Sequence, residues 1–430
     1  MTWHNWAGNQ RTDPKRTVVA RTVEDVVAAV SAAQRDGSKV KALGSGHSFT
    51  AIGVPEDVAV VVPGDPAHLR VDPATNLVTV PAGLRLRELN ALLWARGLSM
   101  PNLGDIDAQT IAGAISTGTH GTGAGLTGIA GQVRGLEMVL ADGRVLTCSP
   151  TENADVFAAA RVGLGALGVL VGVTLQTEPA FRLHAREEGL PFDGVLADLD
   201  RHVAENEHFE FFWFPHTDIA AAKSNNRTEA TGPVRTRMAE FVGEELITNG
   251  VFGLACRIGD VVPALVPRMN RLVASQFAAS EYVDRSYRVF VSPRRVRFVE
   301  MEYAIPRAAI HEALAALRAA VDRHAQGVMF PVEVRFAAAD DIPLSTASGR
   351  DSAYIAVHVH RGQPHDAYFG AVEAIMSGLG GRPHWGKLHT QTAASLRERY
   401  PEFDNFVALR DKLDPERRFT NAYLERVLGP

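Results

Sequence analysis

Gly44-Ser45-Gly46-His47-Ser48 directly follows a strand-like run, Lys39 to Leu43, and this loop decides how the chain is interpreted. Glycines let backbone N–H groups approach a ligand closely, and consecutive N–H groups in such a turn form a concavity that binds anions. A phosphate suits that concavity, and His47 adds a nucleophilic ring nitrogen beside it. A polar turn with a solvated histidine is the alternative interpretation, because short glycine motifs often occur without a function.

A second glycine-rich stretch strengthens the ligand-binding interpretation. Residues 113–128 hold six glycines with Ser, Thr and His between them. Such a stretch cannot pack a conventional core, but its backbone amides and hydroxyls can wrap a polar, extended ligand. The apolar pattern resumes at Leu136, which argues against a flexible linker.

Length and composition predict a two-domain globular protein. The chain has 430 residues, of which 46% are hydrophobic and 22% are charged, and a single core rarely grows to that size. Its formal net charge of -5 predicts no basic surface for nucleic acid or anionic lipid. The longest apolar run, residues 164–175, is too short to span a bilayer, so no transmembrane segment is expected.

Cysteine usage and the N-terminus predict a cytoplasmic protein. Cys148 and Cys256 are the two cysteines of the chain, which is no disulfide framework and favours a reducing compartment. The first residues, Met1 to Trp6, lack the basic and apolar regions of a signal peptide.

The first part of the chain, residues 1–178, alternates helical and strand patterns. Thr22 and Asp25 form a capping-box pattern ahead of valines at helical spacing. Residues 77–80 resemble a strand, and Ala141-Asp142-Gly143-Arg144 between two apolar runs predicts a hairpin. Strand pairs joined by turns favour an α+β domain over a doubly wound sheet.

Pro179 marks the expected start of a second α+β domain, residues 179–378, and residues 379–430 form a C-terminal segment. A helical stripe at residues 310–321 accompanies several strand-like runs. These runs predict a mostly antiparallel sheet and cover residues 209–214, 287–291, 296–304, 328–336 and 354–360.

Two of these predicted strands carry polar side chains on one face. Successive side chains of a strand point to opposite faces, so Glu333 and Arg335 share a face, as do Tyr354, His358 and His360. If the strands are neighbours, the sheet presents Glu, Arg and His on one floor that could bind a polyhydroxy substrate. A solvated face with an ordinary cross-strand ion pair is the alternative.

The histidines also allow a zinc hypothesis. His358 and His360 would need one or two further ligands, for which His384 and His389 are the candidates, together with a catalytic acid. No compact Asp/His cluster accompanies them, so no metal site is predicted. The turn from Arg382 to Lys387 carries an aromatic anchor and potential cations, suited either to binding an anion or to a surface position.

Taken together, these motifs resemble the vanillyl-alcohol-oxidase type of FAD flavoproteins, a two-domain fold with a PCMH-type FAD-binding domain and a substrate (cap) domain. Within that type the chain is most similar to L-gulono-1,4-lactone oxidases and dehydrogenases, D-arabinono-1,4-lactone oxidases and alditol oxidases. No single motif suffices, but their order and spacing match over nearly the whole chain. The matching segments are residues 44–49, 101–105, 116–123, 164–168, 333–335 and 384–387.

The resemblance implies that residues 1–178 and the C-terminal segment hold FAD, and that His47 is bonded covalently to the flavin 8α-methyl carbon. Further cofactor contacts are implied across both glycine-rich stretches and the region around Gly168. They comprise Ala42, Leu43, Gly44, Ser45, Gly46, Ser48, Gly104, Asp105, Thr110, Gly113, Ala114, Ser116, Thr117, Gly118, His120, Gly121, Gly168 and Val169.

The resemblance also implies a substrate site over the flavin ring. Implied substrate contacts are Asp105, Glu333, Arg335, His384 and Lys387, and implied catalytic residues are Glu333, Arg335, His358, His360 and Lys387. Alditol oxidases have a serine where this chain has Asp105, so the chain is more similar to the actinobacterial gulonolactone enzymes in this respect. That difference favours an aldonolactone substrate, with an alditol as the alternative.

The expected chemistry is oxidation of an alcohol carbon, with hydride loss to flavin N5 and proton loss from oxygen. Arg335 and Lys387 are expected to stabilise negative charge, Glu333 to hold substrate hydroxyls and fix Arg335, and His358 or His360 to accept the proton. O2 or another electron acceptor, such as a quinone or a cytochrome, would complete the reaction. A metal hydrolase and a non-catalytic flavin- or nucleotide-binding protein are alternatives from other classes.

Overall fold

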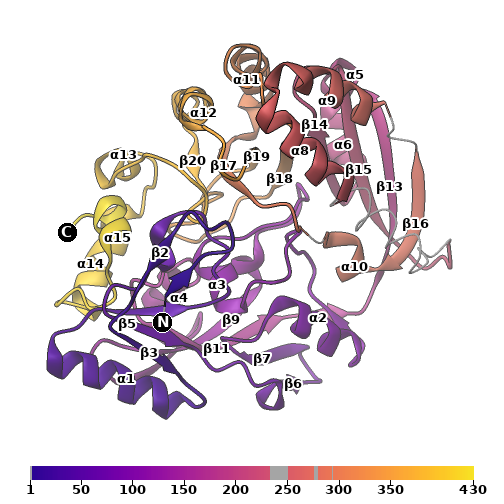
Figure 1. Cartoon of the computed structure of the whole chain (residues 1–430). Helices are drawn as coiled ribbons and strands as arrows, with labels where there is room; N and C mark the ends of the chain where they lie inside the picture. The colour runs from indigo at the N-terminus through magenta and orange to yellow at the C-terminus, as the bar shows by residue number, and fades with distance from the viewer. Residues whose placement is uncertain (1, 233–249, 276–278, 293) are drawn as a thin grey trace.

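The computed structural model describes residues 2–232, 250–275, 279–292 and 294–430. It has two lobes, which Figure 1 shows one above the other, with the N-terminal third of the chain in the lower lobe. In the lower lobe a parallel three-stranded sheet has the order β3-β5-β4, and an antiparallel five-stranded sheet has the order β10-β9-β11-β7-β6. The combination confirms an α+β fold. No described helix is long and apolar enough to cross a membrane.

The strands of the lower lobe are mostly short. Two further pairs, β1 with β2 and β8 with β12, stand apart from the main sheets. Their bounds are β1 Trp3–His4, β2 Arg11–Thr12, β3 Arg16–Val19, β4 Val40–Leu43, β5 Val58–Val61, β6 Arg70–Asp72, β7 Leu77–Pro81, β8 Leu98–Ser99, β9 Val133–Val139, β10 Val145–Cys148, β11 Val169–Gln176 and β12 Glu178–Pro179.

Helix α1 (Val23–Asp36) confirms the capping-box prediction. The Thr22 side chain accepts from the backbone N–H of Asp25, and the Asp25 carboxylate accepts from the backbone of Thr22. The helix ends at Gly37, whose φ of 71° is a left-handed conformation that glycine adopts without steric cost. Val26 and Val30 then pack this helix against the parallel sheet.

The upper lobe is built on one eight-stranded sheet in which every neighbouring pair is antiparallel. Its order is β16-β13-β15-β14-β18-β19-β17-β20, which confirms the predicted antiparallel sheet. The bounds are β13 Arg182–Pro191, β14 His208–Trp213, β15 Ile219–Thr228, β16 Ser280–Arg285, β17 Phe298–Pro306, β18 Val332–Ala337, β19 Ser352–His360 and β20 Arg382–Pro383.

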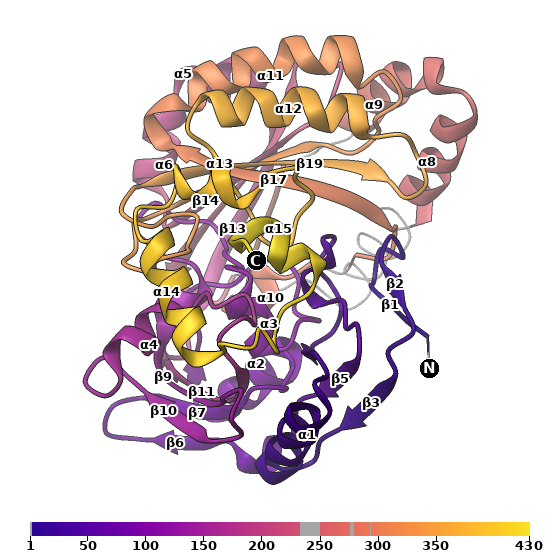
Figure 2. The ribbon, with the colours of Figure 1, turned by 90° about the vertical axis from the view of Figure 1, so that its left-hand side faces the viewer.

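Helices cover the outer face of this sheet, and the lower lobe lies against the other face (Figures 1 and 2). On the outer face, Leu314 and Leu317 of α11 and Val372 of α12 join the apolar side chains of the strands in one core. The described helices are α2 Leu86–Trp94, α3 Ile111–Ser116, α4 Ala154–Ala160, α5 Phe192–Ala197, α6 Leu199–Glu205, α8 Phe252–Val261, α9 Val266–Ala274, α10 Ser286–Phe290, α11 Ile310–His324, α12 Asp366–Gly378, α13 Ala393–Arg397, α14 Phe403–Leu413 and α15 Ala422–Leu428.

One predicted strand is wrong. Residues 287–291 were expected to be extended, but residues 287–290 lie in the short helix α10, where Ser286, Val289 and Phe290 are the buried positions. A short apolar run has no periodicity long enough to separate strand from helix, and here a spacing of three and four residues buries one helical face.

The C-terminal segment returns to the lower lobe. Leu396, Phe403 and Leu424 belong to the same apolar core as β7 and α2. Asn421 caps α15 by accepting from the N–H of Leu424, and its amide donates to the carbonyls of Ala51, Ile52 and Val54. The division into residues 1–178, 179–378 and 379–430 stays a prediction; the third segment begins in the upper lobe, since β20 pairs with β17, and only then returns to the lower lobe.

Candidate functional site

A pocket in the lower lobe lies between the Gly44–Ser48 loop, the start of α3 and the turn before β11. Two features fit an extended polar ligand. The hydroxyl oxygen of Ser45 is buried without a hydrogen-bond partner in the described structure. A Cβ on Gly44 would lie 2.7 Å from Oγ1 of Thr110, so only glycine allows this close approach. An incoming phosphate or ribityl oxygen would satisfy the Ser45 hydroxyl.

His47 lines this pocket. Its ring stacks on Trp6, with ring centroids 5.7 Å apart and an interplanar angle of 21°. Burial, reinforced by the positive charges of Lys387, Arg87 and Arg85, lowers the pKa of His47 to about 4. The imidazole is therefore neutral at physiological pH, which is the form that can act as a nucleophile.

Twelve of the cofactor residues implied by the resemblance line the pocket: Ala42, Leu43, Gly44, Ser45, Gly46, His47, Ser48, Thr110, Gly113, Ser116, Thr117 and Gly168. Ala114 and Val169 instead belong to the apolar cores behind it. Gly104, Asp105, Gly118, His120 and Gly121 are also absent from its lining.

Lys41 also lines the pocket, although its sequence pattern did not single it out. Its ammonium donates to the carbonyl of Phe419 at 3.2 Å and to that of Gly165 at 3.3 Å. Complete burial lowers the pKa of Lys41 to about 7. The sequence did not predict that Lys41 is buried, because a lysine in a short strand at residues 39–43 is expected to be exposed to solvent.

The second glycine-rich stretch divides between two tasks. Its first part lines the pocket, whereas the part from His120 onward joins the lobes. Thr122 accepts from the N–H of Phe336 through its hydroxyl at 3.2 Å, and the N–H of Gly123 donates to the Phe336 carbonyl at 2.8 Å. Nε2 of His120 lies 3.1 Å from the Glu302 carboxylate. The second half of this stretch therefore connects the lower lobe to the upper lobe through hydrogen bonds.

The predicted polar floor exists, and it is buried between the lobes. Strands β18 and β19 are neighbours, with Glu333 opposite Ala356 and Arg335 opposite Tyr354. Strands β14, β15 and β17 on either side add further charged side chains to the same face. We call this face the polar floor and define it by seven side chains: Glu210, Lys223, Glu300, Glu302, Glu333, Arg335 and His358. The alternative of a solvated sheet face is wrong, because Glu333 is 6% exposed and Arg335 is 7% exposed.

Arg335 is the centre of a buried charge network. Its Nε donates to the Glu210 carboxylate at 2.7 Å, and its guanidinium also contacts the Glu333 carboxylate. Asp105 of the lower lobe lies 3.8 Å away and bonds Arg294 at 2.9 Å. Asp105 therefore faces the polar floor, and its role as a substrate contact stays a prediction.

Lys387 and His358 share a second carboxylate, Glu300. The Lys387 ammonium bonds Glu300, and Nε2 of His358 lies 3.4 Å from the same carboxylate. Nδ1 of His358 donates to the Pro331 carbonyl at 3.1 Å, which leaves Nε2 directed at the polar floor. The sequence missed Glu300 and Glu302, although their alternation in β17 follows the same two-residue period that identified Glu333 and Arg335.

The charges of the polar floor set its protonation. Burial raises the pKa of Glu333 to about 7, even though Arg335 opposes the change. Burial also opposes the ionisation of Glu300, but Lys387 and His358 hold its pKa below the usual value. For His358, the carboxylates of Glu300 and Glu333 outweigh burial and raise the pKa. The floor thus holds fixed cations beside one carboxyl group that titrates near neutrality.

The structure separates the other histidines. His360 bonds Asp260 at 2.7 Å and lines a different pocket, so it lies outside the polar floor. His389 bonds the Tyr423 hydroxyl at 2.8 Å. His384 lies near Glu302 and His120, and burial lowers its pKa to about 4. The four histidines of the zinc hypothesis therefore do not gather around one point.

Comparison with known proteins finds two family models that match most of the chain. The family model of D-arabinono-1,4-lactone oxidase matches residues 173–427, and that of the FAD binding domain matches residues 14–149. The chain is 45% identical to an L-gulono-1,4-lactone dehydrogenase of Mycobacterium tuberculosis, covering 100% of this chain and 99% of the relative. It is 35% identical to the L-gulonolactone oxidase of Bos taurus, covering 99% and 98%.

More distant relatives share the architecture. An alditol oxidase of a Streptomyces species is 32% identical over 99% of this chain and 98% of its own. The structure of a solvent-stable cholesterol oxidase superposes with a TM-score of 0.82 over 100% of this chain and 97% of that chain, at 19% identity. At that identity the likeness concerns the fold alone.

Proposed function

Because the chain belongs to the D-arabinono-1,4-lactone oxidase family of FAD-dependent oxidoreductases, we propose that it oxidises an aldono-1,4-lactone, L-gulono- or D-arabinono-1,4-lactone. One observation carries the proposal: a buried floor of cations and carboxylates lies between the lobes, beside a glycine-lined pocket that contains His47. A polyhydroxy ring with its many donors and acceptors matches such a floor.

The pocket residues fit FAD. The Ser45 hydroxyl and the backbone around Gly44 and Gly46 would hold the pyrophosphate, and Thr110 and Ser116 would reach the ribityl chain. When bound, FAD supplies a hydride acceptor, N5 of its isoalloxazine ring. The chain's own groups must then bind the lactone, orient the reacting carbon and take up the hydroxyl proton.

We assign these tasks to the polar floor. Glu333 accepts hydrogen bonds from substrate hydroxyls and orients Arg335, whose fork is held from the other side by Glu210. Arg335 and Lys387 stabilise negative charge that develops on the reacting oxygen. Of the two candidate bases we assign the proton acceptor to His358, because its Nε2 is directed at the floor whereas His360 is paired with Asp260 elsewhere. Glu300 and Glu333 raise the pKa of His358, so it accepts the proton only in its neutral form, at a pH above that raised pKa.

A covalent bond between His47 and the flavin 8α-methyl carbon is the finer part of this proposal. The neutral imidazole of His47 supports it, as does the position of the ring in the pocket. Acid precipitation tests it directly: the wild-type pellet is expected to stay yellow, and the His47→Ala pellet to be colourless. Release of all flavin from the wild-type protein into the supernatant would contradict the bond.

The substrate is tested by mixing the oxidised holoenzyme anaerobically with L-gulono-1,4-lactone, D-arabinono-1,4-lactone, xylitol or sorbitol. Loss of flavin absorbance is expected to be fastest with a lactone. Faster bleaching by the alditols would favour the alternative activity, alditol oxidation with release of hydrogen peroxide, which the alditol oxidase relative suggests. No bleaching with any of the four compounds would overturn both.

O2 or another acceptor would complete the turnover, and a cytoplasmic location is proposed. Cys148 and Cys256 are both free and buried, which suits a reducing compartment.

A further inference from the structure

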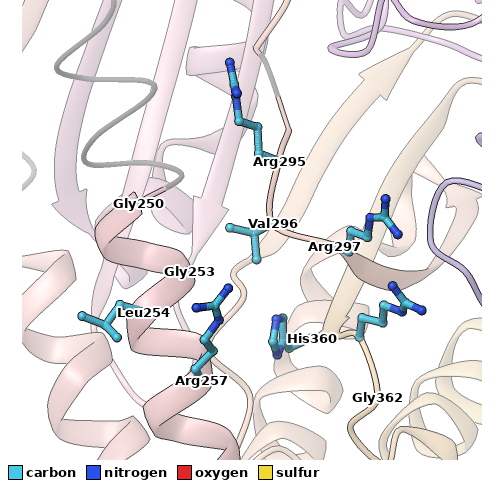
Figure 3. Close-up of a pocket in the computed structure, with 10 residues that line it drawn as sticks. Gly250, Gly253, Leu254, Arg257, Arg295, Val296, Arg297, His360 and Gly362 are labelled. Atoms are coloured by element: carbon cyan, nitrogen blue, oxygen red, sulfur yellow. The ribbon is translucent and has the colours of Figure 1, made fainter.

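Two cavities of the described structure are lined by cations, and these cations differ in burial. A cavity of about 900 Å³ in the upper lobe is lined by Arg257, Arg295 and Arg297, which are exposed, so water can hydrate their charges (Figure 3). Lys41 lines the pocket of the lower lobe instead, and it is 4% exposed. A buried cation is costly unless an anion or several acceptors compensate its charge. Lys41 therefore needs a partner that the exposed arginines do not need.

The side chain of Lys41 points toward the pocket because of its place in β4. Val40 and Ala42 pack into the apolar core under α1, so Lys41 lies on the opposite face of the strand. There its amine donates to the carbonyls of Gly165 and Phe419, at 3.3 and 3.2 Å. These two carbonyls satisfy the two N–H groups of a neutral amine, whereas a charged ammonium has three donors. Among the described residues the third donor has no acceptor, and the pocket is the open space beside it.

Two carboxylates act on Lys41 from a distance, and both are engaged elsewhere. Asp414, which follows α14, accepts from the backbone N–H of Phe419 at 2.8 Å. Glu56, which precedes β5, accepts from the Lys39 ammonium at 3.0 Å. Burial outweighs the attraction of both carboxylates and lowers the pKa of Lys41 to about 7. In the empty pocket the neutral and charged forms of Lys41 are therefore nearly balanced at physiological pH.

The pocket wall beside Lys41 is a strained turn. Leu164 and Gly165 both have left-handed backbone conformations, with φ values of 56° and 63°. A leucine pays a steric cost there, and strain of this kind is concentrated at ligand sites. Leu164 lines the pocket and its N–H donates to the Ser116 carbonyl at 3.1 Å, while Gly165 presents its carbonyl to Lys41. The turn therefore fixes the Lys41 amine at the wall of the pocket.

We propose that Lys41 is the counter-ion of the FAD pyrophosphate, and that FAD binding captures a proton at this side chain. The inference rests on the FAD site of the proposed function. The negative charges of the pyrophosphate favour the charged form of Lys41, and its oxygens can accept from the third N–H. The proton comes from the buffer and joins the lone pair of Nζ, so the step consumes no other reactant. A lysine that only held the Gly165 and Phe419 carbonyls would take up no proton.

Isothermal titration calorimetry of full-length His47→Ala with FAD tests the proposal, because no tether can form and residue 47 cannot titrate. The heat of binding is measured in HEPES and in Tris, which differ in ionisation enthalpy, so the difference counts the protons taken up. With its pKa at about 7 in the empty pocket, about nine in ten Lys41 side chains are neutral at pH 8. We therefore expect an uptake of about one proton per FAD at pH 8 and little at pH 6. The dissociation constant should rise about tenfold per pH unit above 7.

Two changes at Lys41, made in the His47→Ala protein, separate its charge from its titration. Lys41→Arg keeps a charge that does not titrate, so FAD should bind without proton uptake. Lys41→Met should bind FAD at least about tenfold more weakly at pH 6, also without proton uptake. Lys39→Met is the matched control, because the Lys39 ammonium is paired with Glu56 and Glu425 and does not line the pocket. It should keep the proton uptake.

Circular dichroism and the thermal midpoint report whether each variant has folded. FAD binding to the His47→Ala protein without proton uptake at pH 8 would overturn the role of Lys41 and leave the FAD site intact. Proton uptake that survives in Lys41→Arg or Lys41→Met, or an unchanged affinity of Lys41→Met at pH 6, would do the same. Absence of FAD binding to every folded variant would overturn the FAD site as well.

Discussion

At the scale of single residues, the site depends on how buried charges share partners. Arg335 is held by Glu210 and Glu333 and lies within ion-pair distance of Asp105. A buried cation with several carboxylate neighbours is costly to remove, because the neighbours stay behind without compensation. The same argument applies to Glu300, which Lys387 and His358 share.

Two changes at Arg335 separate its charge from its shape. Arg335→Lys keeps the charge but loses the fork that binds two carboxylates, so we expect near-normal folding and a flavin reduction rate about 10²-fold lower. Arg335→Ala leaves the carboxylates unpaired and should also lower the free energy of unfolding by about 3–5 kcal/mol. Anaerobic stopped-flow reduction by lactone and urea titration measure the two effects. Wild-type rates in both variants would contradict the electrostatic role.

Glu333 predicts a pH dependence. Its pKa is raised to about 7, so the carboxylate that accepts from substrate hydroxyls is lost as the pH falls through about 7. The value of kcat/KM for the lactone should therefore rise with pH to a plateau above about 7. In Glu333→Gln the rate should be lower and should no longer rise with pH in this range, whereas Glu152→Gln, in the remote turn between β10 and α4, should keep the pH dependence. A pH dependence that survives in Glu333→Gln would assign the titration to another group.

The same pKa shift has a stability consequence of defined sign. The folded carboxyl of Glu333 keeps its proton up to about pH 7, whereas the unfolded one loses it near its ordinary value of 4.5. Between these values the folded state binds more protons, so the free energy of unfolding contributed by Glu333 falls as the pH rises. Denaturant titrations at pH 5 and pH 8 should show a smaller difference in Glu333→Gln than in the wild type.

At the scale of elements, short segments fix the site more than the large sheets do. The Gly44–Ser48 loop approaches the N-terminus of α3 closely, because Thr110, the N-cap of this helix, leaves no room for a side chain at Gly44. The loop also receives the Lys387 turn, since the N–H of Phe49 donates to the carbonyl of Gly386 at 2.6 Å. The Gly44–Ser48 loop and the turn that carries Lys387 are therefore one structural unit.

Gly44→Ala tests this crowding. The new methyl group would meet Oγ1 of Thr110 at 2.7 Å, so the loop or the cap of α3 must move. We expect destabilisation of about 1–3 kcal/mol and a lower flavin content per protein. Gly125→Ala is the control, because a Cβ there meets nothing within 4 Å. Absorbance ratios at 450 and 280 nm, spectral wavelengths typical of flavin and protein, report the occupancy.

Asn421 tests how the C-terminal segment is anchored. Its side chain caps α15 and donates to the carbonyls around Ile52, beside the cofactor pocket. Asn421→Ala should cost about 1–3 kcal/mol, since it removes the cap and leaves buried carbonyls without a donor. Asn421→Asp keeps the cap acceptor but not the donors, and an intermediate thermal midpoint is expected. Equal midpoints for all three proteins would contradict the anchoring role.

At the scale of the whole molecule, the lower lobe that contains the pocket is bonded directly to the upper lobe through His120 and Thr122, so we expect both lobes to respond together to FAD bound in the pocket. In His47→Ala, FAD binds without a tether, so its stabilising effect should depend on concentration. Free FAD at 100 times its dissociation constant should raise the free energy of unfolding by about 2.7 kcal/mol. With the proposed covalent bond, the wild type should show no such dependence. A single unfolding transition by flavin fluorescence and by circular dichroism is expected for the holoenzyme.

The sequence alone determined the local devices: the capping box at Thr22, the glycine loop at His47, and the two-residue alternation that puts Glu333 and Arg335 on one face. These depend on spacing within a few residues, which the chain itself encodes. Only the tertiary structure decided which strands are neighbours, and hence that His358 rather than His360 joins the floor and that Glu300, Glu302 and Glu210 complete it. Pairing between distant strands, burial and the charges that meet there arise from long-range contacts, which no local pattern in the sequence contains.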